Sequence, residues 1–372
     1  MTEIPAQAPP AGAADDADKA PTAGARSGAG GASDTGGVDG TGGGALRIVH
    51  RSPLRKFLSS SPAYMGLVLL LLVLLFSALR PEAFPTTATG RNISLDISVL
   101  LVMAVGMTYV MVAGGFDLSI GSVLVFSGVV MAKTMSALGG DGALVVVAGM
   151  AAAVLAGVAW GLVNGLCITV LKVPALITTL GTMGAALGAS QLLTGGNDVT
   201  TVPDALLTIT TSRPLGFSWL VYVAALVAVA GGLVLAFTRF GRHTYLVGSN
   251  EESARRAGIN VGRHLVRLYA ISGGLAGVAG AMSLTRFATT TISGHATDAL
   301  QVITGVVLGG TSLYGGIGTV LGTVVGIFIP AVLQNGFVVT HVQPYWQQVV
   351  IGFVLIAAVY VDHLKRARRD RS

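Results

Sequence analysis

Residues 64–79 read YMGLVLLLLVLLFSAL, a stretch that contains no charged side chain. The hydrocarbon core of a bilayer is about 30 Å thick, so a helix of about 20 apolar residues spans it. The stretch begins only at Tyr64, beyond roughly the first thirty residues, where the apolar part of a signal peptide lies. We therefore predict an uncleaved membrane-spanning helix at this position.

Similar apolar runs follow one another from this stretch almost to the end of the sequence. The candidate spans are 64–79, 93–113, 117–138, 143–170, 174–194, 218–238, 266–287, 298–314, 317–339 and 345–362. Two or three of these runs are short enough to be broken or re-entrant helices. The pattern predicts ten spans, with eight as the alternative count.

The overall composition agrees with a chain whose solvent is lipid. Hydrophobic residues make up 52% of the 372 residues and charged residues only 11%, whereas about a quarter of the residues in a soluble domain are charged. We therefore predict an all-α polytopic membrane protein that folds as one helical bundle. The single cysteine, Cys167, excludes a disulfide framework or a cysteine-based metal cluster.

The basic residues predict the orientation of the chain in the membrane. Residues 47–56, 239–267 and 365–371 hold 15 of the 23 lysines and arginines. Basic segments between spans face the cytoplasm, so both termini should be cytoplasmic and the number of spans even. This distribution, rather than nucleic-acid binding, accounts for the net charge of +6.

The spans and the charges divide the sequence into four segments. Residues 1–45 are rich in Gly, Ala, Asp and Thr and are predicted to be a disordered tail. A basic juxtamembrane segment, 46–63, precedes the membrane domain, 64–362, which contains the long loop 239–267. A basic cytoplasmic tail, 363–372, ends the chain.

Residues 249–260 within that loop carry the signals of a short helix. Ser249 or Asn250 suits the N-cap, acidic residues follow it, basic residues come a turn later, and Gly258 suits the left-handed closing position. A helix of about two turns is marginal alone. It should pack against a soluble partner subunit or, alternatively, lie on lipid headgroups.

Glycines recur every four residues in three of the predicted spans, at 157, 161 and 165, at 273 and 277, and at 318, 322 and 326. Such spacing lets two helix backbones approach closely in lipid, and packing within the chain is favoured over a dimer seam. A second pattern, GGxxLxxG, occurs at 114–121 and again at 309–316 and is a weak sign of an internal repeat.

The segment Glu252-Ser253-Ala254, followed by Arg255-Arg256-Ala257 and Gly258, resembles the coupling loop of bacterial ABC importer permeases. That loop reads Glu-Ala-Ala, three residues, then Gly, so Ser253 replaces its middle alanine. The resemblance implies a cytoplasmic coupling helix that docks on a separate ATP-binding subunit. Its residues here are Asn250, Glu251, Glu252, Ser253, Ala254, Arg255, Arg256, Gly258 and Ile259.

Further stretches resemble one branch of these proteins, the ribose/xylose/arabinose-type permeases. They are 114–122 (GGFDLSIGS), 173–182 (VPALITTLGT), 309–318 (GGTSLYGGIG), 334–336 (QNG) and 345–348 (YWQQ), and the similarity extends over about residues 60–362. The resemblance implies a multi-pass permease of the bacterial cytoplasmic membrane that imports a monosaccharide such as ribose or xylose.

The same resemblance implies the partners of this permease. They are an ATP-binding subunit, an extracytoplasmic sugar-binding protein, and a second permease copy in a homodimer or heterodimer. ATP and Mg would be used by the ATP-binding subunit, with no cofactor bound by this chain. The alternatives are a branched-chain amino acid permease of similar architecture and a stand-alone secondary carrier.

Polar residues in or beside the spans are candidates for the substrate pathway: Asp117, Ser119, Asn164, Thr178, Thr179 and Asn335. Hydrogen bonds between helices are the alternative role for each of them. An ionisable residue near a span is a functional candidate. For Asp117 we favour a different role, the N-cap of the span that follows it.

The motifs of common enzymes are missing from the sequence. No Gly-Lys dipeptide occurs, so there is no Walker A phosphate loop, and neither a GxSxG nor an HExxH motif occurs. The six histidines have no metal-ligand spacing. We therefore predict a transport subunit that has no catalytic residues, no metal site and no ATPase site of its own.

Overall fold

The computed structural model describes residues 61–343 and, beyond them, 345–346, 349–350, 352–353, 356–357 and 360. Its elements are α2 (Ser61–Leu79), α3 (Thr87–Val112), α4 (Ile120–Leu138), α5 (Ala143–Thr169), α6 (Ala175–Thr194), α7 (Asp204–Thr211), the 3₁₀ turn η1 (Pro214–Gly216), α8 (Trp219–Phe237), α9 (Arg239–Ser249), α10 (Glu251–Arg256), α11 (Val261–Phe287), α12 (Asp298–Leu308) and α13 (Val320–Val339). The described residues contain helices, turns and loops but no strand.

Seven of these helices are long and apolar enough to cross a membrane: α3, α4, α5, α6, α8, α11 and α13. The all-α polytopic prediction is therefore confirmed. The apolar parts of α2 and α12 are shorter, and the tenth predicted span, 345–362, is described only in part. The count of ten and the cytoplasmic termini remain predictions. The segments 1–45 and 363–372 and residues 46–60 lie outside the described residues.

The predicted span 298–314 is wrong in its extent. Helix α12 ends at Leu308 because Gly309 and Gly310 follow it, and Gly310 has a φ of 89°, a left-handed conformation. Eleven residues rise only about 16 Å, too little to cross the hydrocarbon core. The chain then turns through residues 311–319, where the Ser312 N–H donates to the Ile317 carbonyl at 2.9 Å.

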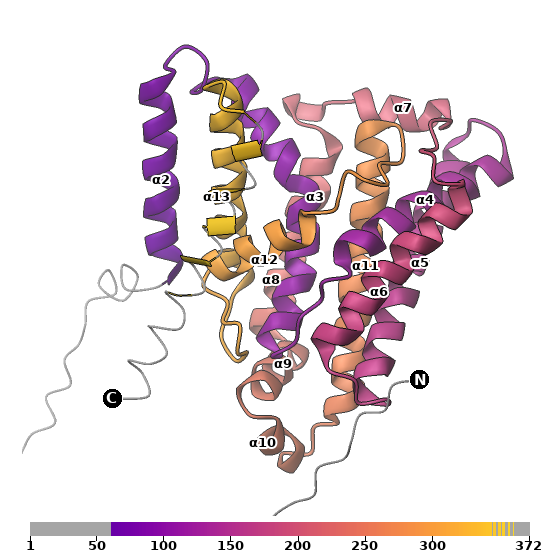
Figure 1. Cartoon of the computed structure of the whole chain (residues 1–372), viewed down its shortest axis with the longest axis vertical. Coiled ribbons are helices and arrows are strands. Elements are labelled where there is room, and N and C mark those ends of the chain that lie inside the picture. The colour runs from indigo at the N-terminus through magenta and orange to yellow at the C-terminus, as the bar shows by residue number, and fades with distance from the viewer. Residues whose placement is uncertain are drawn as a thin grey trace, which may run out of the picture. The chain divides into compact units, whose positions relative to one another are not determined.

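Helix α3 lies at the centre of the described bundle. It packs against α8, α11, α12 and α13 (Figure 1), and every residue from Leu101 to Val112 is buried. A helix that is apolar all round and buried all round belongs to the interior. Helix α8 differs from α3 in burial, because its Leu226, Val229 and Leu233 side chains are exposed. Exposed apolar side chains are not unfavourable where the surrounding solvent is lipid.

Glycine seams hold two pairs of helices together. Helices α5 and α11 run side by side (Figure 1), and a β-carbon at Gly157 would overlap the carbonyl oxygen of Gly273. One turn away, a β-carbon at Gly161 would overlap the Tyr269 carbonyl oxygen, and Gly326 on α13 faces the Gly305 carbonyl of α12 in the same way. These close approaches confirm that the glycine spacing serves packing within the chain.

Candidate functional site

Helix α10 has the local structure predicted for residues 249–260. The Asn250 side chain accepts a hydrogen bond from the Ser253 N–H at 2.8 Å and caps the helix. At the other end Gly258 has a φ of 81°, and its N–H donates to the Arg255 carbonyl at 3.0 Å. The helix is therefore closed at both ends by its own residues.

The charged side chains of α10 stand on its outer surface. Glu251 pairs with Arg255 at 2.5 Å and Glu252 with Arg256 at 3.1 Å, and all four side chains are more than half exposed. Ala254 on the opposite face is 1% exposed and belongs to the hydrophobic core. The helix thus rests on the bundle through one small side chain and presents a band of charge outward.

Helix α9 lies within the stretch predicted as a loop, 239–267, and connects α10 to the bundle. Its Tyr245 hydroxyl donates to the Gly318 carbonyl at 2.6 Å, and burial raises the pKa of this phenol, so it remains a donor. The Thr244 hydroxyl lies 2.9 Å from Nε2 of His264, which is buried at the start of α11. Side chains of α9 therefore fasten it both to α11 and to the segment before α13.

The two GGxxLxxG segments meet at the end of α9. The first, 114–121, runs from the end of α3 into the first residues of α4, and the second, 309–316, lies between α12 and α13. The Gly316 N–H donates to the Val112 carbonyl at 2.8 Å, and Gly315 lies against both Gly114 and the Gly248 carbonyl. The two segments therefore touch one another and the end of α9, but their backbones are not equivalent, because the left-handed glycine is the first of its pair, Gly114, in one and the second of its pair, Gly310, in the other. The internal repeat stays a prediction.

Asp117 lies in the first of these turns and is 2% exposed. One carboxylate oxygen accepts from the Ser119 N–H and hydroxyl at 3.1 and 2.6 Å, and the other accepts from the Ser272 hydroxyl of α11 at 2.9 Å. The Asn164 amide of α5 donates to the Ser119 hydroxyl at 2.9 Å and accepts from the Thr182 hydroxyl of α6 at 2.6 Å. This polar network ties four helices together.

The network corrects the cap that we favoured for Asp117. Helix α4 begins at Ile120 with Ser119 as its N-cap residue, so Asp117 is two residues too early and lies inside the bundle rather than at its edge. Its carboxylate reaches α11 because the turn folds back between the helices. A buried carboxylate is retained only when its oxygens accept hydrogen bonds, as they do here.

The side chains of the other candidates for the substrate pathway do not join this network. Thr179 is fully buried and its hydroxyl donates to the Ala175 carbonyl of its own helix at 2.9 Å. The Thr178 hydroxyl is buried and has no hydrogen-bond partner within the described part of the chain. Asn335 lies half-buried on α13. Five of the six candidates are thus buried in this conformation, and their role in a pathway stays a prediction.

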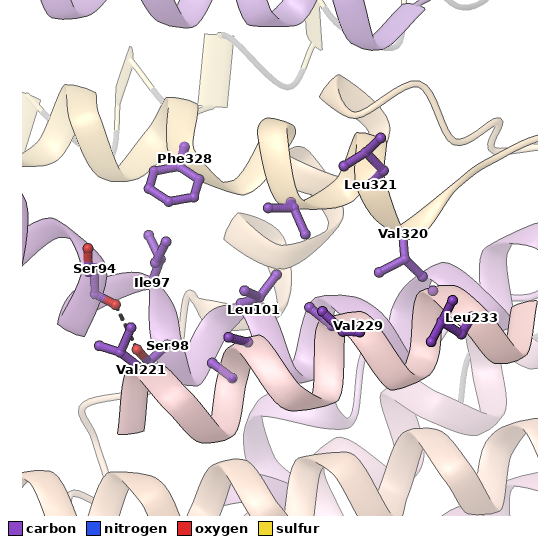
Figure 2. Close-up of a pocket in the computed structure, with 15 residues that line it drawn as sticks. Ser94, Ile97, Ser98, Leu101, Val221, Val229, Leu233, Val320, Leu321 and Phe328 are labelled. Atoms are coloured by element: carbon purple, nitrogen blue, oxygen red, sulfur yellow. Dashed lines mark hydrogen bonds between the residues drawn. The ribbon is translucent and has the colours of Figure 1, made fainter. Parts of the chain in front are cut away.

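A groove of about 500 Å³ opens between α3, α8 and α13. Figure 2 shows its lining, which is aliphatic apart from two serines and the ring of Phe328. The Ser98 hydroxyl donates to the Ser94 carbonyl at 2.6 Å and the Ser94 hydroxyl to the Gly90 carbonyl at 2.8 Å. The groove therefore offers no free polar group and is suited to lipid chains rather than to a polar solute.

A second cavity, of about 380 Å³, has a polar lining that the sequence analysis missed. It contains Asp96 of α3 and Arg286 of α11, which form an ion pair. Both are charged residues within predicted spans, and that signal alone marks a residue as a functional candidate. Each also lies near the end of its predicted span, where the membrane surface explains a charge equally well.

Comparisons with known proteins agree with this architecture. Residues 90–359 match the family model described as branched-chain amino acid transport system / permease component. The chain is 37% identical over 304 residues to the ribose import permease protein RbsC of Escherichia coli, which covers 81% of this chain and 93% of that protein.

Two further relatives are similar over most of their length. The galactose/methyl galactoside import permease protein MglC of Escherichia coli is 33% identical, with 84% of this chain and 96% of that protein covered. The fructose import permease protein FrcC of Rhizobium meliloti is 31% identical, with coverage of 83% and 87%. No solved structure matches the chain.

Proposed function

Because the chain belongs to the family of branched-chain amino acid transport system permease components, we propose that it is the membrane-spanning subunit of an ATP-driven importer for a monosaccharide. The observation that carries this proposal is the similarity to the ribose permease over 93% of that protein. The galactose and fructose permeases support a sugar as the solute and leave the particular sugar open.

The energy for transport would come from a separate ATP-binding subunit. This chain has no Gly-Lys dipeptide and therefore no Walker A phosphate loop to hold ATP and Mg. Helix α10 is the candidate docking site, because its charged band is exposed and its fold is complete without a partner. An extracytoplasmic sugar-binding protein and a second permease copy would complete the transporter.

A movement of α10 has a direct route into the bundle. Helix α9, which directly precedes α10, contacts the two GGxxLxxG turns through Tyr245 and Gly248. From the first turn, the Asp117 network extends to α5, α6 and α11. We infer that closure of the ATP-binding subunits shifts α10 and that these turns are the element whose position differs between the outward-open and inward-open states.

The experiment that tests this function combines purification with uptake. The full chain is tagged at its C-terminus and expressed in its own bacterium, native membranes are solubilised gently, and the co-purifying proteins are identified by mass spectrometry. Uptake of labelled ribose, galactose, fructose and leucine is measured in the same cells with and without the gene.

Recovery of an ATPase with a Walker A loop, together with sugar uptake that requires the gene and ATP, is the expected result. Gene-dependent uptake of leucine in place of sugars would assign the chain to amino acid import. Transport that continues after ATP depletion, with the chain recovered alone, would refute the ATP-driven importer and favour a secondary carrier.

A further inference from the structure

The polar cavity at the Phe287 end of α11 lies far from α10. Helix α11 contains 27 residues and so rises about 40 Å, more than the thickness of the hydrocarbon core. Its Val261 end follows α10 directly, whereas Arg286 and Phe287 at its other end line the cavity. If α10 faces the cytoplasm, this cavity belongs to the extracytoplasmic half of the protein.

One side of the cavity is lined by an ion pair between two helices. Arg286 of α11 contacts Asp96 of α3 through its guanidinium and also donates to the Leu95 carbonyl at 3.4 Å. The side chains of Arg286 and Asp96 remain 22% and 41% exposed. Their remaining donor and acceptor positions are therefore available to a molecule in the cavity.

A second wall is built around His295, in the segment between α11 and α12. Its Nδ1 lies 2.7 Å from the Asp298 carboxylate and its Nε2 lies 2.8 Å from the Ser283 hydroxyl. Both ring nitrogens are occupied, so the ring is held in one orientation. The Asp298 side chain still borders the cavity and contributes a carboxylate to its lining.

Other polar groups in the lining have hydrogen-bonding capacity to spare. The Thr291 hydroxyl is buried and has no partner within the described residues. The side-chain amide of Gln334 bonds to no other described residue, and that of Gln301 makes a single long contact of 3.4 Å with Thr297. Gln301 is half-buried and Gln334 is exposed, so both amides are accessible to a ligand. A buried polar group without a partner costs free energy, so a ligand that bonded to the Thr291 hydroxyl would gain from binding.

The remaining lining is apolar and includes Phe287, Val99, Leu100 and Ala331. A cavity of 380 Å³ falls within the range of about 300–1,000 Å³ that holds small molecules. Two carboxylates against one guanidinium leave no excess of positive charge, which disfavours an anion. Hydroxyl-binding groups around an apolar surface instead match a neutral ring that carries hydroxyls on its edge and C–H groups on its faces.

We propose that this cavity is the site at which the permease first holds its solute, and that the solute is a neutral, polyhydroxylated ring of monosaccharide size. The proposal rests on the proposed function and names the residues that would receive the sugar. Gln301 and Gln334 are the amides free to bond to its hydroxyls, and the Asp96–Arg286 pair borders the same space.

The test uses the complete transporter in its own bacterium and labelled ribose, galactose and fructose as probes. Gln301→Leu and Gln334→Leu remove an amide but keep a similar volume, and each should lower uptake at low sugar concentration about tenfold, as loss of one hydrogen bond to the solute predicts. Gln191→Leu, an exposed glutamine on α6 outside the cavity, is the matched control and should retain wild-type uptake. Membrane abundance and basal ATPase activity are measured for all three variants.

A second measurement does not depend on transport. In a Cys167→Ser background, Gln301→Cys is exposed to a membrane-impermeant thiol reagent from outside the cell. Labelling that the transported sugar suppresses is the expected result. Absence of labelling, or labelling that the sugar leaves unchanged, would overturn the site.

The outcomes separate the two proposals. Gene-dependent uptake of leucine in place of sugars by wild-type cells would contradict the proposed function itself. Wild-type uptake together with normal uptake by Gln301→Leu and Gln334→Leu would leave the function standing and refute this cavity as the sugar site.

Discussion

Near the Val261 end of α11 the two ion pairs of α10 stand on the surface, whereas at the Phe287 end Arg286 is paired across the bundle with Asp96. The pairs on α10 join residues four apart in one helix, so they hold no two helices together. The Asp96–Arg286 pair joins α3 to α11 beside a cavity. Charge at the first end is therefore available to another protein, while charge at the second end is part of the internal architecture.

The greatest loss of stability should follow disruption of the glycine seam between α5 and α11, the helix that runs from α10 to the polar cavity. A leucine at Gly161 would overlap the Tyr269 backbone of α11. Helices α5 and α11 would have to separate, and overpacking of this kind destabilises by about 3 kcal/mol or more. We expect Gly161→Leu to abolish the monodisperse peak of detergent-solubilised protein in size-exclusion chromatography.

Gly184→Leu is the matched control, because Gly184 on α6 is exposed with open space where a β-carbon would stand. This variant should give a normal peak. A folded Gly161→Leu protein would show that close packing of α5 against α11 is not required for the fold.

Charge reversal on α10 should have the next largest effect and should act on function alone. We expect Glu251→Lys combined with Glu252→Lys to lower ATP-driven uptake at least about tenfold through repulsion at the docking face. Insertion and thermal stability should stay near wild type, because both side chains are exposed. Uptake and melting temperature are measured on the same preparation.

A charge swap separates docking from helix stability. Glu251→Arg with Arg255→Glu keeps an ion pair within α10 but exchanges the positions of its charges. Low uptake by this variant supports recognition of the charge pattern by the ATP-binding subunit. Normal uptake by the reversal and the swap alike would contradict the assignment of α10 as the docking helix.

A moderate loss of stability should follow removal of the internal charge. Arg286→Ala leaves Asp96 without its partner in a half-exposed position, and we expect a destabilisation on the order of 1–2 kcal/mol. Thermal unfolding in detergent measures it. The double variant with Asp96→Ala should recover part of the loss, and a double variant less stable than Arg286→Ala would show that the ion pair contributes little.

Removal of one partner from an exposed pair on α10 should change stability least. Arg255→Ala removes one partner of an exposed pair on α10, and such pairs contribute about 0.3–0.5 kcal/mol. Its melting temperature should therefore lie closer to wild type than that of Arg286→Ala. The reverse order would mean that α10 supports the fold rather than a partner.

Features set by neighbouring residues could be predicted from the sequence. The caps and charges of α10 lie within ten residues of one another. The apolar runs identified the seven long helices because a helix that spans lipid must be apolar along its own length. The glycine spacing at 157 and 161 also predicted close packing, since only a glycine allows two backbones to touch there.

Features set by distant residues could not be predicted in this way. Asp117 bonds to Ser272, 155 residues later, and Asp96 pairs with Arg286, 190 residues later. Nothing local in either segment indicates the partner. The early end of α12 was missed for another reason: the predicted span ran on through Gly310 to Leu313 and Tyr314, whereas the left-handed backbone at Gly310 stops the helix.

The closed ends of α10 have a consequence for the speed of assembly. A segment that folds only on binding loses conformational entropy at that moment, and this slows or weakens association. Helix α10 is already ordered by Asn250, Gly258 and its two ion pairs. An ATP-binding subunit that docks on it meets a rigid target, so their encounter should be governed by diffusion and charge steering, and its rate should fall as salt is added.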